Sequence, residues 1–211
     1  LAQDPSVHYG KLLRLNDDGT PAADNPFVES GEYLPEVYTV GHRNIIGLDF
    51  HPDSGELWAT ENGPQGGDEA NIIQAGTNYG WPIVSYGQHY DETFKNVREA
   101  PLHKPHSKYG FLEPIKNYTP AIGISEIIKI PQTFDSNFKN DYFVAAMGKY
   151  LHEGDLTIHH IRLNNEFNKI VYSSVIPIGE RIRDLSFLEN ENKIIMILEN
   201  TPSIGIIEKK D

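Results

Sequence analysis

Short apolar runs separated by turn residues dominate the hydrophobic pattern of this chain. Ile46, Leu48 and Phe50 alternate with Gly47 and Asp49, which predicts a strand with one buried face, and residues 56–60 follow a turn as its hairpin partner. Further strands are predicted at residues 10–15, 122–130, 141–147, 156–163, 169–176, 183–188, 193–198 and 203–208. No stretch of ten or more residues has a convincing amphipathic helical period. The pattern therefore predicts an all-β fold.

Two segments of the chain share one plan, which narrows the choice among all-β architectures. Residues 44–61 and 183–200 each contain an apolar strand, a turn and a second apolar strand, and in both an arginine comes just before the first strand and Glu-Asn just after the second. Radial repetition of four-stranded sheets produces such internal similarity. We therefore expect residues 1–211 to form one partial β-propeller domain, with a long irregular segment between blades at residues 83–121.

Composition excludes several classes of partner. The 18 basic residues are outnumbered by 30 acidic ones, which gives a net charge of −12 and disfavours nucleic acids and anionic membranes. No run of about 18 apolar residues is present, so no membrane span is predicted. Cysteine is absent, which excludes disulfides, thiol catalysis and cysteine-bound zinc and is consistent with an exported protein.

The segment at residues 61–69 has no strand or helix period and contains three glycines, one proline and three acidic residues. Glycine lets the backbone approach a ligand closely, and proline leaves a carbonyl without a neighbouring N–H group. Carbonyl and carboxylate oxygens are the ligands that Ca²⁺ prefers. On chemistry alone, a cation-binding loop and an ordinary acidic surface loop both remain open.

Several motifs occur in an order that resembles a known family. They are GHRN at 41–44, ELWATENGPQGGDEANII at 56–73, NYGWP at 78–82 and RIRD at 181–184, with GKLLRL at 10–15 and DGTPAADNPF at 18–27 upstream. This series resembles the soluble glucose and aldose sugar dehydrogenases that depend on pyrroloquinoline quinone (PQQ), also called the glucose/sorbosone dehydrogenase family. The resemblance implies a six-bladed propeller, of which this chain would form about three to four blades from the C-terminal half.

The resemblance also implies which residues contact the cofactor. Arg181 and Arg183 match two arginines that bind the PQQ carboxylates, and their spacing in a strand places both on one face. Tyr118 would stack on the quinone. The full set implied for PQQ is Arg43, Asn44, Asn62, Asp68, Tyr118, Lys149, Arg181 and Arg183.

Two Ca²⁺ sites are implied by the same resemblance. The backbone carbonyls of Gly63 and Pro64 match ligands of the active-site ion, and Glu69 with the main-chain oxygen of Tyr79 matches a second, structural ion. None of the nine histidines matches the family's general base, so no catalytic residue is assigned. His103 and His106 lie near prolines in a loop without an acid at metal-ligand spacing, and His159 and His160 should point to opposite faces of a strand.

The implied function is oxidation of an aldose at C1, with electrons passed to an external acceptor, in the periplasm or outside the cell. One alternative is a non-catalytic propeller module that binds Ca²⁺ together with sugar or protein, and another is a calcium-stabilised structural fragment without activity. Ile45 and Ile46 stand where the family has Pro-Gln, and Glu126 where it has glycine, which favours the first alternative.

A partial propeller has a physical consequence of its own. About three blades expose two apolar blade faces, whereas a closed ring buries each blade against its neighbours. We therefore expect the chain to form a homodimer, to pair with a missing N-terminal half, or to cover these faces with a loop.

Overall fold

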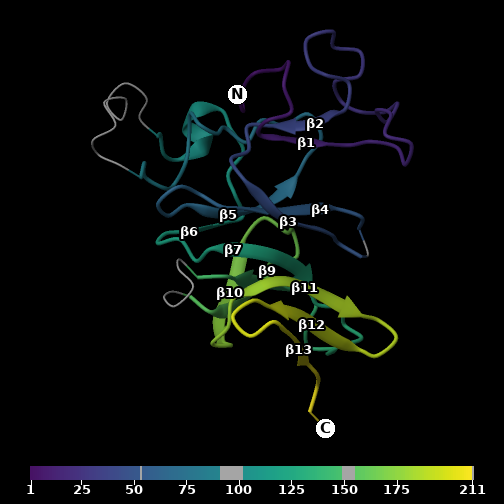
Figure 1. Cartoon of the computed structure of the whole chain (residues 1–211), viewed down its shortest axis with the longest axis vertical. Helices are drawn as coiled ribbons and strands as arrows, with labels where there is room; N and C mark the ends of the chain where they lie inside the picture. Colours follow the sequence, from purple (N-terminus) through teal and green to yellow (C-terminus); the bar gives the residue numbers. More distant parts are fainter. Residues whose placement is uncertain (53, 91–101, 149–154, 211) are drawn as a thin grey trace.

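The chain forms four antiparallel sheets that are stacked one on another (Figure 1). The computed structural model describes residues 1–52, 54–90, 102–148 and 155–210. A two-stranded sheet contains β1 (Lys11–Leu13) and β2 (Val37–Val40). The first blade contains β3 (Ile45–Phe50), β4 (Leu57–Glu61), β5 (Asp68–Ile73) and β6 (Lys116–Tyr118). The second contains β7 (Ile124–Lys129), β8 (Asp141–Ala146), β9 (Thr157–Leu163) and β10 (Ile170–Pro177), and the third contains β11 (Ile182–Leu188), β12 (Lys193–Leu198) and β13 (Ser203–Ile207).

The second blade is buried on both faces, as β8 illustrates. Every residue of β8 is buried, and successive side chains of a strand point to opposite faces. Tyr142 and Val144 join the apolar core shared with the first blade, whereas Phe143 and Ala145 join the core shared with the third. The first core is centred on Trp58, whose ring lies 4.6 Å from that of Tyr142. This face-to-face stacking of antiparallel sheets confirms the predicted β-propeller architecture.

The face predicted to be buried on β3 is exposed, which corrects the sequence prediction. Ile46, Leu48 and Phe50 are 42 %, 46 % and 63 % exposed. Leu12 of β1 and Tyr38 of β2 pack against the core around Ala59 and Ile73, on the central strands β4 and β5 of the first blade, and this part of β3 stays uncovered. On the opposite face Gly47 is buried against β7. The packing there is so close that a Cβ on Gly47 would lie 2.5 Å from the carbonyl oxygen of Ser125.

A second apolar face is exposed at the other end of the stack. Ile197 on β12 and Ile204 and Ile206 on β13 are 48–69 % exposed, and the register of the two strands places all three on one face. The blade stack thus ends in an uncovered apolar surface at both ends, as the sequence predicts for a partial propeller.

The long segment at residues 83–121 is not wholly irregular in its described part. It contains the short 3-10 helix η1 (His106–Tyr109) and β6, which pairs with β5 and completes the first blade. No helix in the described ranges is long and apolar enough to cross a membrane.

Candidate functional site

The loop between β4 and β5 is held in place by the side chain of Asp68. Its Oδ1 atom accepts a hydrogen bond from the N–H of Gly63 at 3.0 Å, and its Oδ2 atom accepts two from the N–H groups of Ile122 and Ile124 at 3.0 and 3.1 Å. Burial raises the pKa of the Asp68 carboxyl, although these N–H groups oppose the rise. The carboxylate therefore ties the loop to the segment that leads into β7.

A cavity of about 810 Å³ lies beside this loop. Its walls come from the turn before β3, from the loop itself and from segments next to β7, β8 and β11, which are far apart in sequence. The volume is within the usual range for small-molecule and cofactor sites. The predicted ligands that line it are Arg43, Asn44, Asn62, Gly63, Pro64, Asp68 and Arg181.

The glycines of the loop let its backbone fold tightly at the cavity wall. A Cβ on Gly63 would lie 2.2 Å from the carbonyl oxygen of Gly66, so no side chain fits there. Among the described residues, no donor forms a hydrogen bond with the carbonyl oxygen of Gly63 or Pro64. Both residues are buried and line the cavity, so their oxygens are available to a hard cation.

Arg43 reaches across the loop from the turn before β3. Its Nη1 donates a hydrogen bond to the carbonyl oxygen of Asn62 at 2.6 Å, and its guanidinium lies 5.5 Å from the ring centroid of Trp81. Asn62 in turn donates a side-chain hydrogen bond to the carbonyl of Ile124 at 2.8 Å. These contacts fix a positive charge at the edge of the cavity.

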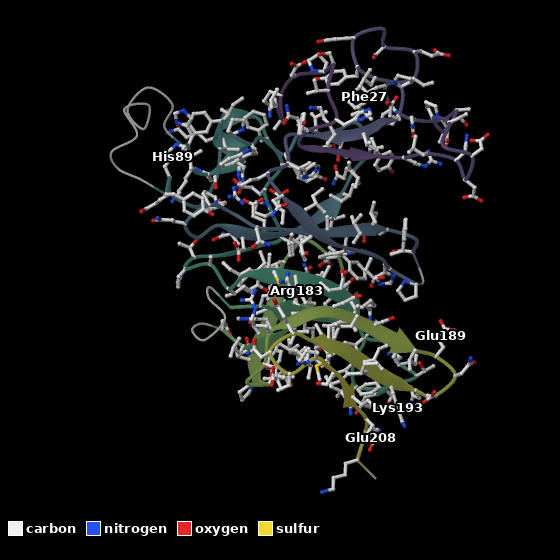
Figure 2. All side chains as sticks on the ribbon, viewed as in Figure 1. Phe27, His89, Arg183, Glu189, Lys193 and Glu208 are labelled. Carbon is white, nitrogen blue, oxygen red and sulfur yellow. The ribbon has the colours of Figure 1, made fainter. Side chains whose placement is uncertain are left out.

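Arg181 and Arg183 converge on one carboxylate that the sequence interpretation missed. Nε of Arg181 lies 2.8 Å from Oε2 of Glu199, and Nη2 of Arg183 lies 2.9 Å from Oε1. The two arginines lower the pKa of Glu199 to about 2. Arg181 lines the cavity. Arg183 lies at the start of β11 (Figure 2). Its Nη1 atom lies 3.1 Å from the sulfur of Met147. The Glu-Asn pair that ends both sequence repeats was a signal that could have identified Glu199.

The structure does not bring every predicted cofactor ligand to the cavity. Tyr118 is buried in the core between the first two blades, where its ring packs edge-on against His159 at 5.0 Å. Lys149 lies outside the described residues. His159 and His160 have separate partners, Asp155 and Asp141 respectively, as expected for opposite faces, but both are buried.

Glu69 and Tyr79 lie on a separate, much smaller cavity of about 10 Å³. It also borders Glu61, His106 and Ser85, and it shares Arg43 and Gly63 with the larger cavity. Its size is close to that of a single water molecule or small ion.

Two buried acidic side chains, Glu61 and Glu69, line this small cavity together with Arg43. Burial and the charges of Glu61 and Glu113 raise the pKa of Glu69 well above its usual value. Nε2 of His106 lies 3.6 Å from Oε1 of Glu69, and burial lowers the pKa of His106. Glu61 is held by Nδ1 of His42 at 2.9 Å. Buried carboxylates are costly unless a cation compensates them, so the donor set fits a cation.

The geometry also limits what kind of cation site this could be. In the described part of the chain, no group of three or more histidine, cysteine, aspartate or glutamate side chains is arranged to hold a metal ion. A cation here would therefore need backbone oxygens as well as carboxylates. The sequence interpretation missed His106 because its carboxylate neighbour Glu69 lies 37 positions earlier in the chain.

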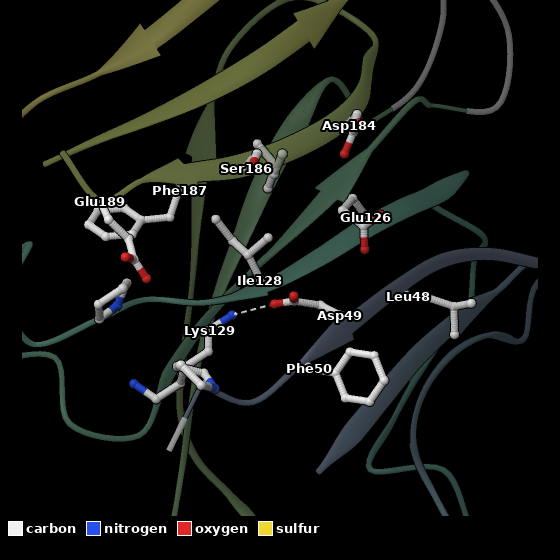
Figure 3. A pocket seen from close by; sticks show the side chains of 13 residues that line it. Leu48, Asp49, Phe50, Glu126, Ile128, Lys129, Asp184, Ser186, Phe187 and Glu189 are labelled. Carbon is white, nitrogen blue, oxygen red and sulfur yellow. Dashed lines mark hydrogen bonds between the residues drawn. The ribbon is translucent and has the colours of Figure 1, made fainter. Parts of the chain in front are cut away.

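A groove of about 480 Å³ lies along the inner strands of all three blades (Figure 3). Asp49 on β3, Glu126 on β7 and Asp184 on β11 line it. Burial, followed by the charges of Asp184 and Asp49, raises the pKa of Glu126 to about 7. Glu126 does not line the cavity that contains Arg43 and Arg181, so its charge lies outside the candidate cofactor site.

Known proteins resemble the chain in both sequence and structure. It is 39 % identical over 184 residues to the uncharacterized protein slr1608 of Synechocystis, covering 87 % of this chain and 42 % of that protein. It is 46 % identical over 89 residues to aldose sugar dehydrogenase YliI of Escherichia coli, covering 42 % of this chain and 24 % of that protein.

The crystal structure of the soluble aldose sugar dehydrogenase from Escherichia coli in the apo-form matches with a TM-score of 0.80 and 28 % identity, over 97 % of this chain and 55 % of that one. The PQQ-bound aldose sugar dehydrogenase of Streptomyces coelicolor matches with a TM-score of 0.66 and 25 % identity, over 96 % and 49 %.

The fold is that of a partial β-propeller, with a cavity at the loops that join its strands. The chain spans about half the length of the solved structures it matches. The profile of the Glucose / Sorbosone dehydrogenase family matches residues 1–205, and the chain belongs to this family.

Proposed function

We propose that this chain supplies the cofactor-binding part of a PQQ- and Ca²⁺-dependent dehydrogenase that oxidises aldose sugars at C1 and passes electrons to an external acceptor. One observation carries the proposal. The cavity of about 810 Å³ brings together, from distant parts of the sequence, two arginines, two asparagines and two carbonyls that accept no hydrogen bond from the described part of the chain. This set suits a flat, polyanionic cofactor with a hard cation beside it.

Each group in the cavity has a role in the proposed site. Arg43 and Arg181 would bind carboxylates of PQQ, since guanidinium groups offer paired donors to such anions. Asn44 and Asn62 would orient the cofactor through their amides, and the carbonyls of Gly63 and Pro64 would hold Ca²⁺. When bound, PQQ supplies a hydride acceptor and Ca²⁺ a Lewis acid.

Glu199 would hold the guanidinium groups of Arg181 and Arg183 in a fixed orientation. It is bonded to Arg181 and Arg183 at once, and Arg181 also donates to the carbonyl of Met147 at 2.6 Å. Such fixed donors lose little conformational entropy when an anion binds. Arg183 pairs with the same carboxylate but does not line the cavity, which supports a role in positioning rather than direct contact.

The second cation would bind at Glu69 and the main-chain oxygen of Tyr79 in the small cavity. The raised pKa of the Glu69 carboxyl indicates an uncompensated negative charge, which a cation would relieve. This ion would stabilise β5 and the following turn.

The side chains that line the large cavity also support the non-catalytic alternative. Oxidation at C1 needs a base for the hydroxyl proton, and none of the described histidines lines the large cavity. The carboxylate of Asp68 lines it but already accepts three backbone hydrogen bonds. A calcium-binding module that holds a sugar or a protein without turnover would use the same cavity.

Reconstitution separates the two functions. The chain is mixed with PQQ and Ca²⁺, and cofactor binding is followed by absorbance before glucose and a dye acceptor are added. Dye reduction that depends on both PQQ and Ca²⁺ is expected for the dehydrogenase, and it should fall in Arg181→Gln. Cofactor binding without dye reduction would favour the binding module, and no cofactor binding would contradict the proposed site. A periplasmic or secreted location is part of the proposal, in keeping with a chain without cysteine.

A further inference from the structure

The rim of the large cavity carries an aromatic side chain that none of the family motifs includes. Tyr90 lines the cavity, yet 65 % of it is exposed. Large aromatic side chains are usually buried, and an exposed ring at the edge of a cavity offers an apolar surface to a ligand.

Three contacts hold this ring in place from one side. Nη2 of Arg43 donates to the Tyr90 hydroxyl at 3.2 Å, and the guanidinium lies 5.9 Å from the ring centroid. Nε2 of Gln65 donates to the Tyr90 carbonyl at 2.9 Å. Tyr90 is therefore anchored through both its backbone and its side chain, so ligand binding would cost little conformational entropy at this residue.

Two glutamines line the same cavity as Tyr90. Gln65 and Gln88 both line the cavity, and their backbones pair through reciprocal hydrogen bonds of 2.9 and 3.0 Å. This pairing fixes the spacing between the loop that contains Gln65 and the segment that contains Tyr90. The rim thus combines an anchored aromatic ring with neutral donors and acceptors.

This combination matches the chemistry of a sugar better than that of a charged cofactor. One face of a pyranose ring presents C–H groups with slight positive charge, which pack against the negative face of an aromatic ring. The hydroxyl groups around its edge need neutral donors and acceptors, which amides provide. Arg43 and Arg181, which also line the cavity, favour anions instead.

We infer that Tyr90 is the platform on which the aldose ring packs, and that Gln65 and Gln88 flank it as hydrogen-bonding partners for the sugar hydroxyls. The inference rests on the proposed function, because it assigns the substrate part of the same cavity. Tyr90 would set affinity for the sugar directly, and it would affect affinity for the cofactor less, through its contact with Arg43.

Binding of a sugar that cannot react tests this assignment directly. Methyl β-D-glucopyranoside has a blocked C1 hydroxyl, so saturation-transfer NMR on the chain with PQQ and Ca²⁺ reports its binding without turnover. Tyr90→Ala should weaken binding about tenfold, and Tyr90→Phe, which keeps the ring, should stay within about twofold. Tyr9→Ala is the matched control, since Tyr9 is 69 % exposed but does not line the cavity.

Several results would overturn the assignment. They are equal binding by Tyr90→Ala and the unchanged chain, an equal loss in Tyr90→Phe, loss of PQQ binding in Tyr90→Ala, and no saturation transfer in the unchanged chain. The dye assay with glucose reports on the proposed function separately. Sugar binding that depends on Tyr90 without dye reduction would favour the binding module and leave the assignment of Tyr90 intact.

Discussion

Glu199 lies 2.8 Å from Nε of Arg181, and this pair joins the end of β12 to the turn before β11. Arg183 shares the same carboxylate, so one acidic side chain pairs with two arginines and the cluster keeps a net positive charge. The first blade has a parallel arrangement, in which Arg43 donates to the carbonyl of Asn62 at the end of β4. The two sequence repeats thus use the end of the second strand to fix an arginine that precedes the first.

This shared carboxylate predicts an acid-sensitive contribution to stability. The folded pKa of Glu199, about 2, lies below its ordinary value of 4.5, so the contribution is present above pH 4.5 and is lost as the pH falls toward 2. Glu199→Gln should lower the free energy of unfolding by about 1 kcal/mol at pH 7 and by less at pH 3. Urea denaturation at both pH values measures the difference, and an equal loss at both would contradict the ion-pair explanation.

Replacement of Asp68 should loosen the cavity loop. Asp68→Ala leaves the buried N–H groups of Gly63, Ile122 and Ile124 without their acceptor, which should cost about 2–4 kcal/mol of unfolding free energy. Asp17→Ala, at an exposed turn, is the control and should change stability by less than about 0.5 kcal/mol. Equal stability of the two variants in urea would show that these hydrogen bonds contribute little.

The raised pKa of Glu126 implies that this group lowers the stability of the fold as the pH rises above 4.5. Its folded pKa of about 7 exceeds the ordinary value of 4.5, so stability is greatest below pH 4.5 and falls as the pH rises to 7. Glu126→Gln removes the buried charge and should raise the free energy of unfolding at pH 8 by about 2 kcal/mol, with little change at pH 4.5. Urea denaturation of the variant between these values should show a flatter pH dependence. A slope equal to that of the unchanged chain would rule out Glu126 as its source.

Chelation tests the proposed cation at Glu69. Ca²⁺ that binds only the folded chain raises its melting temperature, so EDTA should lower it. Glu69→Gln should remove this response, and in EDTA the variant should melt above the unchanged chain because a buried charge is gone. Glu29→Gln, at an exposed site, should keep the response. Identical EDTA shifts in the Glu69 and Glu29 variants would exclude Glu69 as a ligand.

The uncovered end faces should drive association of the chain. Phe50 at one end and Ile204 at the other are 63 % and 69 % exposed. The double variant Phe50→Glu/Ile204→Glu should show a lower average mass in sedimentation velocity than the unchanged chain, because burial of these faces is then costly. Val171→Glu, on the outer strand β10, is the control. A monomer at every concentration tested would contradict this prediction.

Most strands of the second and third blades could be predicted from sequence, whereas part of the first could not. Apolar and β-branched residues fill β7 to β9 and β12, so the pattern is clear without knowledge of neighbours. In β5, Asp68, Glu69 and Asn71 are all buried, and such polar residues mimic a loop in any pattern based on hydropathy. The prediction failed there because the site, rather than the core, determines these residues.

The candidate site shows the same division. Ordered motifs identified Arg43, Asn62 and Arg181, which the fold brings to one cavity. Tyr118 looked equally suitable in sequence, but its place at the end of β6 turns the ring into the core. Glu199, His106 and Tyr90 could not be predicted, because their partners lie 18, 37 and 47 positions away and only the stacking of the sheets brings them together.

The two apolar ends of the stack also make the chain a starting point for design. Repeat proteins remain soluble because terminal repeats with a polar outer face cap the array. Polar substitutions at Leu48 and Phe50 on one end and at Ile204 and Ile206 on the other would provide such caps without touching either inter-blade core. A capped stack would isolate the loop that contains Gly63 in a small scaffold, where the cation binding that we propose for it could be measured apart from any catalysis.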